Sequence, residues 1–172
     1  MLALLLAAGA AQAQSLLAPW AGPGSAPMPP WREVLLPKQT LPKTRFEITE
    51  LDGQRVLRID SQASYGNLVH ELTAPAGAAH RLSWRWRLDQ AIAGAALQTK
   101  AGDDAAVKVC VMFDHAIEQV PFVERQQLRL ARLISGEDLP AATLCYVWDA
   151  LQPAGSVLPN AYTRRMRWFV LQ

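Results

Sequence analysis

The 172-residue sequence predicts a mostly β fold, an antiparallel β-sandwich of jelly-roll type with one short amphipathic helix. Several segments alternate apolar and polar residues with a period of two, which is the period of a strand that buries one face. Twelve prolines and ten glycines supply many turns, and six tryptophans supply large anchors for a β core. Helices do not alternate with the strands, which disfavours a helix-flanked parallel sheet.

The first thirteen residues have the features of a signal peptide. An apolar run over residues 2–11 is too short to span a bilayer, which takes roughly 20 residues. It ends in Ala11-Gln12-Ala13, the pattern of small side chains that signal peptidases read. No Lys or Arg precedes the run, and a buried core helix is the alternative interpretation. We expect cleavage before Gln14 and a periplasmic or secreted mature chain without a transmembrane segment.

Residues 14–30 are rich in Pro, Gly and Ala and predict a loose leader. One domain is expected over residues 31–172, beginning with a strand at residues 31–36. The clearest local feature is a hairpin in which residues 44–51 and 54–60 form the strands. Asp52-Gly53 lies between them, and this dipeptide tolerates the positive φ angles of a tight hairpin turn.

Further strands are expected along the middle of the chain. Leu68, His70 and Leu72 share one face of a strand, and residues 105–113 alternate in the same way. Residues 80–88 alternate most clearly, with Trp84 and Trp86 on the apolar face. We therefore expect both tryptophans to be buried in the core, with an exposed platform for a sugar as the alternative. The arginines between them, at positions 81, 85 and 87, are expected on a solvated face, with anion binding as the alternative.

Residues 121–134 predict the one helix. Pro121 suits the first helical turn because that turn does not need its missing N–H, and Ser135-Gly136 closes the segment. Four apolar residues fall on one helical stripe, namely Val123, Leu130, Leu133 and Ile134. Strands are expected again at residues 143–148 and 165–171.

Composition and motifs exclude several function classes. With 17 basic and 15 acidic residues, the net charge of +2 gives no field strong enough to argue for nucleic acid or an acidic membrane. His70, His80 and His115 lack the spacing of a zinc site. No G-x-S-x-G, P-loop or dinucleotide-binding glycine pattern occurs. No cofactor is expected, apart from a weak calcium candidate.

Two cysteines, Cys110 and Cys145, can pair if the chain is exported to an oxidising compartment. Each lies on the face of its strand that points away from the clearest apolar neighbours. Paired strands can bring both thiols to one face, provided that the register is right. The alternative is two buried thiols that never meet.

Four polar residues are candidates for a ligand site. Asp103 and Asp104 stand at the entrance of a strand, where they can form a turn, bind Ca²⁺ with backbone oxygens, or act as acid and base. Asn160 and Tyr162 follow Pro159 in an expected loop, where either a turn or a binding site fits.

Four segments, taken in order, carry a resemblance to a family. They are residues 82–87 (LSWRWR), 99–104 (TKAGDD), 145–148 (CYVW) and 155–163 (GSVLPNAYT). In these the chain resembles the exported bacterial proteins grouped as DUF3047, with Ala161 where the family tends to have Pro. The resemblance implies an exported β-rich domain and supplies no activity. Members continue past the position of Gln172, so we expect a C-terminally truncated domain here.

Three functions follow as expectations. The first is an exported cell-envelope protein that binds a ligand, such as a glycan or another small molecule, without covalent chemistry; this rests on analogy of fold. The second is an envelope hydrolase that uses Asp103 or Asp104. The third is a structural envelope protein without a small ligand.

Overall fold

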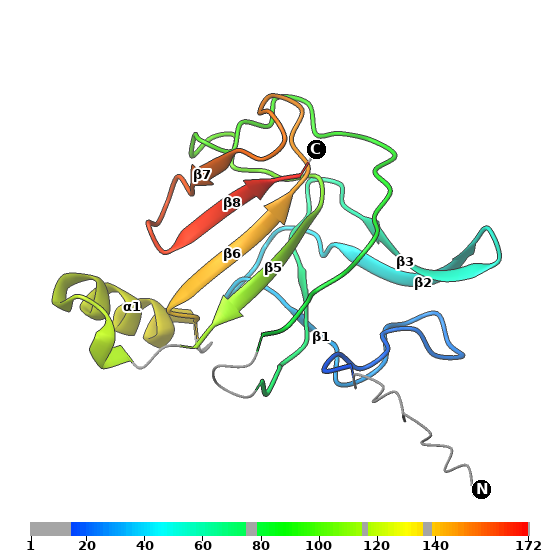
Figure 1. The fold of residues 1–172 in the computed structure, drawn as a ribbon, viewed down its shortest axis with the longest axis horizontal. Coiled ribbons are helices and arrows are strands. Elements are labelled where there is room, and N and C mark those ends of the chain that lie inside the picture. Colours follow the sequence, from blue (N-terminus) through cyan, green and yellow to red (C-terminus); the bar gives the residue numbers. More distant parts are fainter. Residues whose placement is uncertain (1–14, 75–78, 115–116, 136–138, 172) are drawn as a thin grey trace, which may run out of the picture. The chain divides into compact units, whose positions relative to one another are not determined.

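The computed structural model describes residues 15–74, 79–114, 117–135 and 139–171 (Figure 1). The expected signal peptide and the imidazole of His115 lie outside these ranges. The chain divides into two compact units, with the boundary between Arg81 and Leu82. The described residues are mostly β, as predicted, with one α-helix among them. Within them, no helix combines the length and apolar character that crossing a membrane requires.

The first unit holds two small antiparallel sheets. Strand β1 (Arg32–Val34) pairs with β4 (Asn67–Val69), and β2 (Arg45–Leu51) pairs with β3 (Gln54–Asp60). Asp52 and Gly53 join β2 to β3 with φ angles of 50° and 73°. Positive φ at both turn residues matches the twist of the strands, so the predicted hairpin is confirmed.

The leader is tied to the first unit and does not hang free as its composition suggests. The Ala18 amide donates to Nε2 of His70 at 3.1 Å, and the Trp31 indole N–H donates to the Ala18 carbonyl at 2.9 Å. Farther along, the Ile48 amide donates to the Ser25 carbonyl at 2.7 Å. These long-range hydrogen bonds satisfy backbone groups of the leader, which also pairs within itself where the Met28 amide donates to the Trp20 carbonyl at 3.0 Å.

The second unit is built on a four-stranded sheet in the order β5-β6-β8-β7 (Figure 1). Its strands are β5 (Lys108–Phe113), β6 (Ala142–Val147), β7 (Val157–Pro159) and β8 (Met166–Val170). The β6–β8 pair is parallel and the other pairs are antiparallel. The sheet is therefore mixed, which departs from the purely antiparallel pairing expected. The jelly-roll sandwich stays a prediction.

One face of this sheet forms the main core. Its period-two neighbours Cys145 and Val147 are fully buried, and Trp168 and Val170 of β8 lie beside them. Cys110 and Cys145 stand directly opposite each other and form a disulfide with Sγ–Sγ 1.99 Å. Both cysteines thus face the core, and the face of Tyr146 and Trp148, which the sequence marks as more apolar, is only half-buried.

The strand predicted over residues 80–88, from the clearest alternation in the sequence, is not formed. The segment has no strand assignment. Trp84 and Trp86 are half-buried, while Arg85 between them is exposed, so the alternation of faces survives without full burial. Trp84 packs on Tyr146 of β6 with ring centroids 5.3 Å apart, and Tyr146 packs on Phe169 at 5.5 Å. Trp84 thus covers part of the half-buried face of the sheet, Trp86 packs on Trp84 with ring centroids 5.8 Å apart, and neither tryptophan belongs to the buried core.

The predicted helix is confirmed as α1 (Phe122–Ser135), which follows a short 3₁₀ turn, η1 (Ile117–Gln119). Among the helix side chains that the structure describes, only that of Leu128 is buried. It packs with Val120 and Ala141. The stripe that the periodicity identifies does not face this core: Val123, Leu130, Leu133 and Ile134 are all exposed.

Candidate functional site

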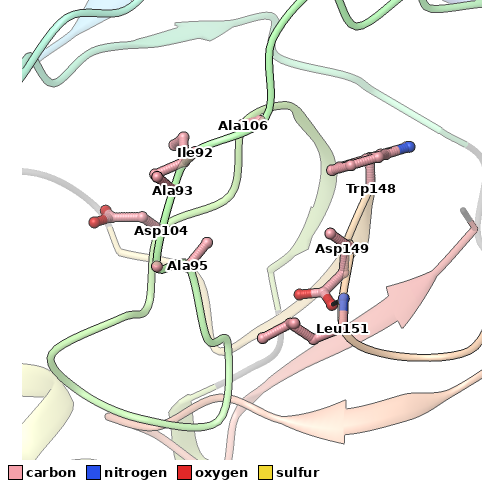
Figure 2. Close-up of a pocket in the computed structure, with 10 residues that line it drawn as sticks. Ile92, Ala93, Ala95, Asp104, Ala106, Trp148, Asp149 and Leu151 are labelled. Atoms are coloured by element: carbon pink, nitrogen blue, oxygen red, sulfur yellow. Dashed lines mark hydrogen bonds between the residues drawn. The ribbon is translucent and has the colours of Figure 1, made fainter.

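A pocket of about 280 Å³ opens on the second unit (Figure 2). Two chain segments form its walls. One wall is the segment after β6, from Trp148 to Leu151, and the other is residues 92–95 with Asp104 and Ala106. The lining is mainly apolar, with Asp149 on the first wall and Asp104 on the second.

The β6 wall follows from how that strand ends. Val147 is the last residue of β6 and points into the core, so alternation turns the half-buried Trp148 away from the core and toward the pocket. Asp149 is only 7% exposed. Its Oδ1 accepts the amides of Leu151 and Gln152 at 2.7 and 2.8 Å, which fixes the turn.

Figure 2 shows the consequence for the Asp149 carboxylate. One of its oxygens is held at the turn, and the other is directed into the space between the two walls. The indole of Trp148 lies above it. The Asp149 carboxylate, a hydrogen-bond acceptor, and the flat Trp148 indole therefore both belong to one wall of the pocket.

The opposite wall depends on tight turns. Gly94 has φ +77°, a conformation that other residues rarely adopt. The Ala96 amide donates to the Gly102 carbonyl at 2.7 Å. A Cβ at Gly102 would lie 2.9 Å from the Ala96 nitrogen, so glycine is required for this approach. In Figure 2 the Asp104 carboxylate points away from the Trp148 wall.

Three of the four sequence candidates join two loops. Nδ2 of Asn160 donates to Oδ2 of Asp103 at 2.9 Å, and the Tyr162 hydroxyl donates to the Lys100 carbonyl at 2.8 Å. Oδ1 of Asn160 accepts the amides of Tyr162 and Thr163. These contacts hold residues 100–103 against residues 160–163, so the segments 99–104 and 155–163 share a structural role.

Burial shifts two charged groups near this junction. It raises the pKa of the Asp103 carboxyl, against the hydrogen bond from Asn160 and the charge of Lys108. Oδ1 of Asp103 is buried and lacks a hydrogen-bond partner among the described residues. Lys108 as a whole has a large exposed surface, but the Nζ at the end of its side chain lies over the Trp168 ring, 5.8 Å from its centroid. Desolvation of the ammonium there lowers the pKa of Lys108, although Asp103 and Asp104 act in the opposite direction.

The structure thus separates the adjacent aspartates. Asp103 turns to Asn160, whereas Asp104 is exposed at the rim of the pocket. No group of three or more His, Cys, Asp or Glu side chains suited to a metal ion occurs in the described ranges. The calcium candidate at this pair stays a hypothesis.

Sequence reasoning missed Trp148 and Asp149 as site residues. The available signal was their position, since an aromatic and an acid come directly after an apolar strand, where binding residues often lie. Nothing in the sequence indicated the second wall, because residues 92–95, Asp104 and Ala106 come from a separate loop earlier in the chain.

The family model described as "Protein of unknown function (DUF3047)" matches residues 29–172. No curated protein and no solved structure matches the chain.

Proposed function

The chain belongs to the DUF3047 family of proteins of unknown function, and from that premise we propose that it is an exported envelope protein that binds a small ligand at the Trp148 pocket. The ligand class we propose is a glycan, bound without covalent chemistry. The proposal rests on the pairing of the Trp148 indole with the Asp149 carboxylate on one wall.

Sugar rings suit this pairing for a physical reason. Their C–H faces are apolar and pack on a flat indole, while their hydroxyls need acceptors at the ring edge. Asp149 offers a carboxylate oxygen held in place by the hydrogen bonds of its partner oxygen. The volume of about 280 Å³ is near the lower end of small-molecule sites, roughly 300 Å³, so the site suits a small glycan fragment.

Export is supported by two independent features. The apolar run over residues 2–11 ends in an A-x-A pattern. The Cys110–Cys145 disulfide belongs to an oxidising compartment such as the periplasm.

The hydrolase alternative has less geometric support. Glycoside hydrolysis takes two carboxyl groups that face each other across the bond to be cleaved. Asp104 and Asp149 both line the pocket, but the Asp104 carboxylate is directed away from Asp149. Asp103 is directed to Asn160.

Native mass spectrometry of the purified protein with a mixture of envelope glycan fragments tests the proposal. We expect a glycan adduct on the wild type and on Trp86→Ala, because Trp86 is half-buried outside the pocket. Trp148→Ala should lose the adduct. Equal adducts on Trp148→Ala and wild type would refute the site, and release of shortened fragments abolished by Asp104→Asn would favour the hydrolase.

A further inference from the structure

The outer face of α1 is apolar and uncovered in this structure. Five large side chains lie on it with exposed fractions from 57% to 81%: Phe122, Val123, Leu130, Leu133 and Ile134. These five residues are called the α1 stripe below. Gln126 and Gln127 lie between its two ends, so the stripe consists of an apolar pair at the start of the helix and an apolar triplet near its end. Exposed apolar side chains that gather on one face in this way mark interaction sites on soluble proteins, because scattered single residues are the norm elsewhere on a surface.

The inner side of α1 is anchored by few groups. Leu128 enters a small cluster with Val120 and Ala141, Nε of Arg132 donates to the Leu139 carbonyl at 2.9 Å, and Glu124 pairs with Arg165 at 3.0 Å. A helix of this length is marginal alone and draws its stability mainly from burying an apolar face. Here the larger apolar face is the one left in solvent.

Charge along the helix favours one kind of partner. Arg125, Arg129 and Arg132 follow i, i+4, i+7 spacing and form a basic row beside the α1 stripe. Glu124 is the one acid in the helix sequence, and Arg165 already pairs with it. A second copy of the chain would bring two basic rows together, which costs energy. An anionic surface complements the row.

We propose that α1 docks on the surface of an anionic phospholipid bilayer. The helix is about 21 Å long at 1.5 Å per residue and would lie in the plane of the interface. The α1 stripe would enter the boundary between headgroups and acyl chains. Of the three arginines, Arg129, which is exposed, and Arg125, whose guanidinium lies over the Phe122 ring, would contact lipid phosphates at its border, while Arg132 stays bound to the Leu139 carbonyl. The net charge of the whole chain conceals this site because acidic residues elsewhere cancel the local excess of arginine.

Vesicle cosedimentation tests the proposal with two compositions, pure phosphatidylcholine and equal parts of phosphatidylcholine and phosphatidylglycerol. We expect binding to the anionic vesicles only, weakening as salt is added. Arg129→Gln should lower the affinity by about fivefold, the effect of one basic residue near an anionic surface. The double variant Leu130→Ser/Leu133→Ser should lose more than tenfold.

The matched control is Leu41→Ser/Leu72→Ser, which changes two leucines of the first unit that are 51% and 48% exposed. It should bind like the wild type. Absence of binding to anionic vesicles, or equal binding by the two double variants, would overturn the proposal. A dimer that the Leu130→Ser/Leu133→Ser variant abolishes would assign the stripe to a second copy instead. Arg129→Gln keeps the test decisive if the leucine variant fails to fold.

Discussion

Removing the Cys110–Cys145 disulfide should destabilise the second unit by a calculable amount. The bridge closes a loop of 35 residues between paired strands. In the chain-entropy model, a loop of this length contributes about 4 kcal/mol by restricting the unfolded chain. At the usual 2–4 °C per kcal/mol for a chain of this size, reduction should lower the melting temperature by about 8–16 °C.

The assay compares thermal unfolding of oxidised wild type, reduced wild type and Cys110→Ala/Cys145→Ala. The oxidised–reduced difference isolates the cross-link. The double variant should melt slightly below the reduced protein, because Cys145 is fully buried and alanine leaves part of its space unfilled. Its melting temperature should not respond to reductant. Two free thiols in denatured, unreduced periplasmic protein, or equal melting of oxidised and reduced wild type, would refute the reasoning.

Three further predictions concern packing and charge. Trp168→Ala should cost about 3–5 kcal/mol in urea unfolding because Trp168 is 2% exposed, whereas the half-buried Trp84 should cost clearly less when changed to Ala; equal losses would show that the two positions are packed alike. The raised pKa of Asp103 means that the folded state binds the proton of this carboxyl more tightly than the unfolded state does. The contribution of Asp103 to the free energy of unfolding therefore falls as pH rises from 3.8 through the folded pKa, and Asp103→Asn should gain stability relative to wild type over that window. The opposite trend in urea titrations of the two proteins would contradict the burial argument. Asn160→Ala should lower the free energy of unfolding more than Tyr162→Phe does, by about 1–3 against 0.5–1.5 kcal/mol. It removes three hydrogen bonds and leaves Oδ2 of Asp103 without its donor, whereas Tyr162→Phe removes one. Unfolding midpoints of both variants equal to that of the wild type would mean that the loops are not held by this junction.

Local signals in the sequence carried the hairpin and the helix. Asp52-Gly53 requires positive φ at both positions, and the alternation on either side determines which residues face the core. For α1, Pro121 and the 3.6-residue spacing define where the helix begins and which residues share a stripe. Periodicity cannot say which stripe is buried, and here the small contact through Leu128 decides it.

Non-local pairing accounts for what the sequence could not predict. Residues 80–88 alternate as a strand does, but alternation alone does not supply a neighbouring strand to complete a hydrogen-bonded ladder. Asn160 and Asp103 meet across 57 residues of chain, so neither position reveals the other. The parallel β6–β8 pair likewise depends on where the chain returns after β7.

The same limit applies to the candidate site. Asp103, Asp104, Asn160 and Tyr162 were recognisable as polar residues in loops, and the structure gives three of them hydrogen bonds that join those loops. The pocket itself needs Trp148 and Asp149 beside residues 92–95. This juxtaposition depends on the folded chain and leaves no spacing in the sequence.

Nuclear magnetic resonance of the indole N–H groups tests the binding proposal most directly. The sequence has six tryptophans, and the Trp148 signal is assigned by its loss in Trp148→Ala. On titration with an envelope glycan fragment, we predict that the Trp148 resonance moves to saturation while that of Trp168, buried in the core, stays in place. A saturable shift at other tryptophans with Trp148 unmoved, or no shift with any fragment of the envelope glycans, would contradict the account.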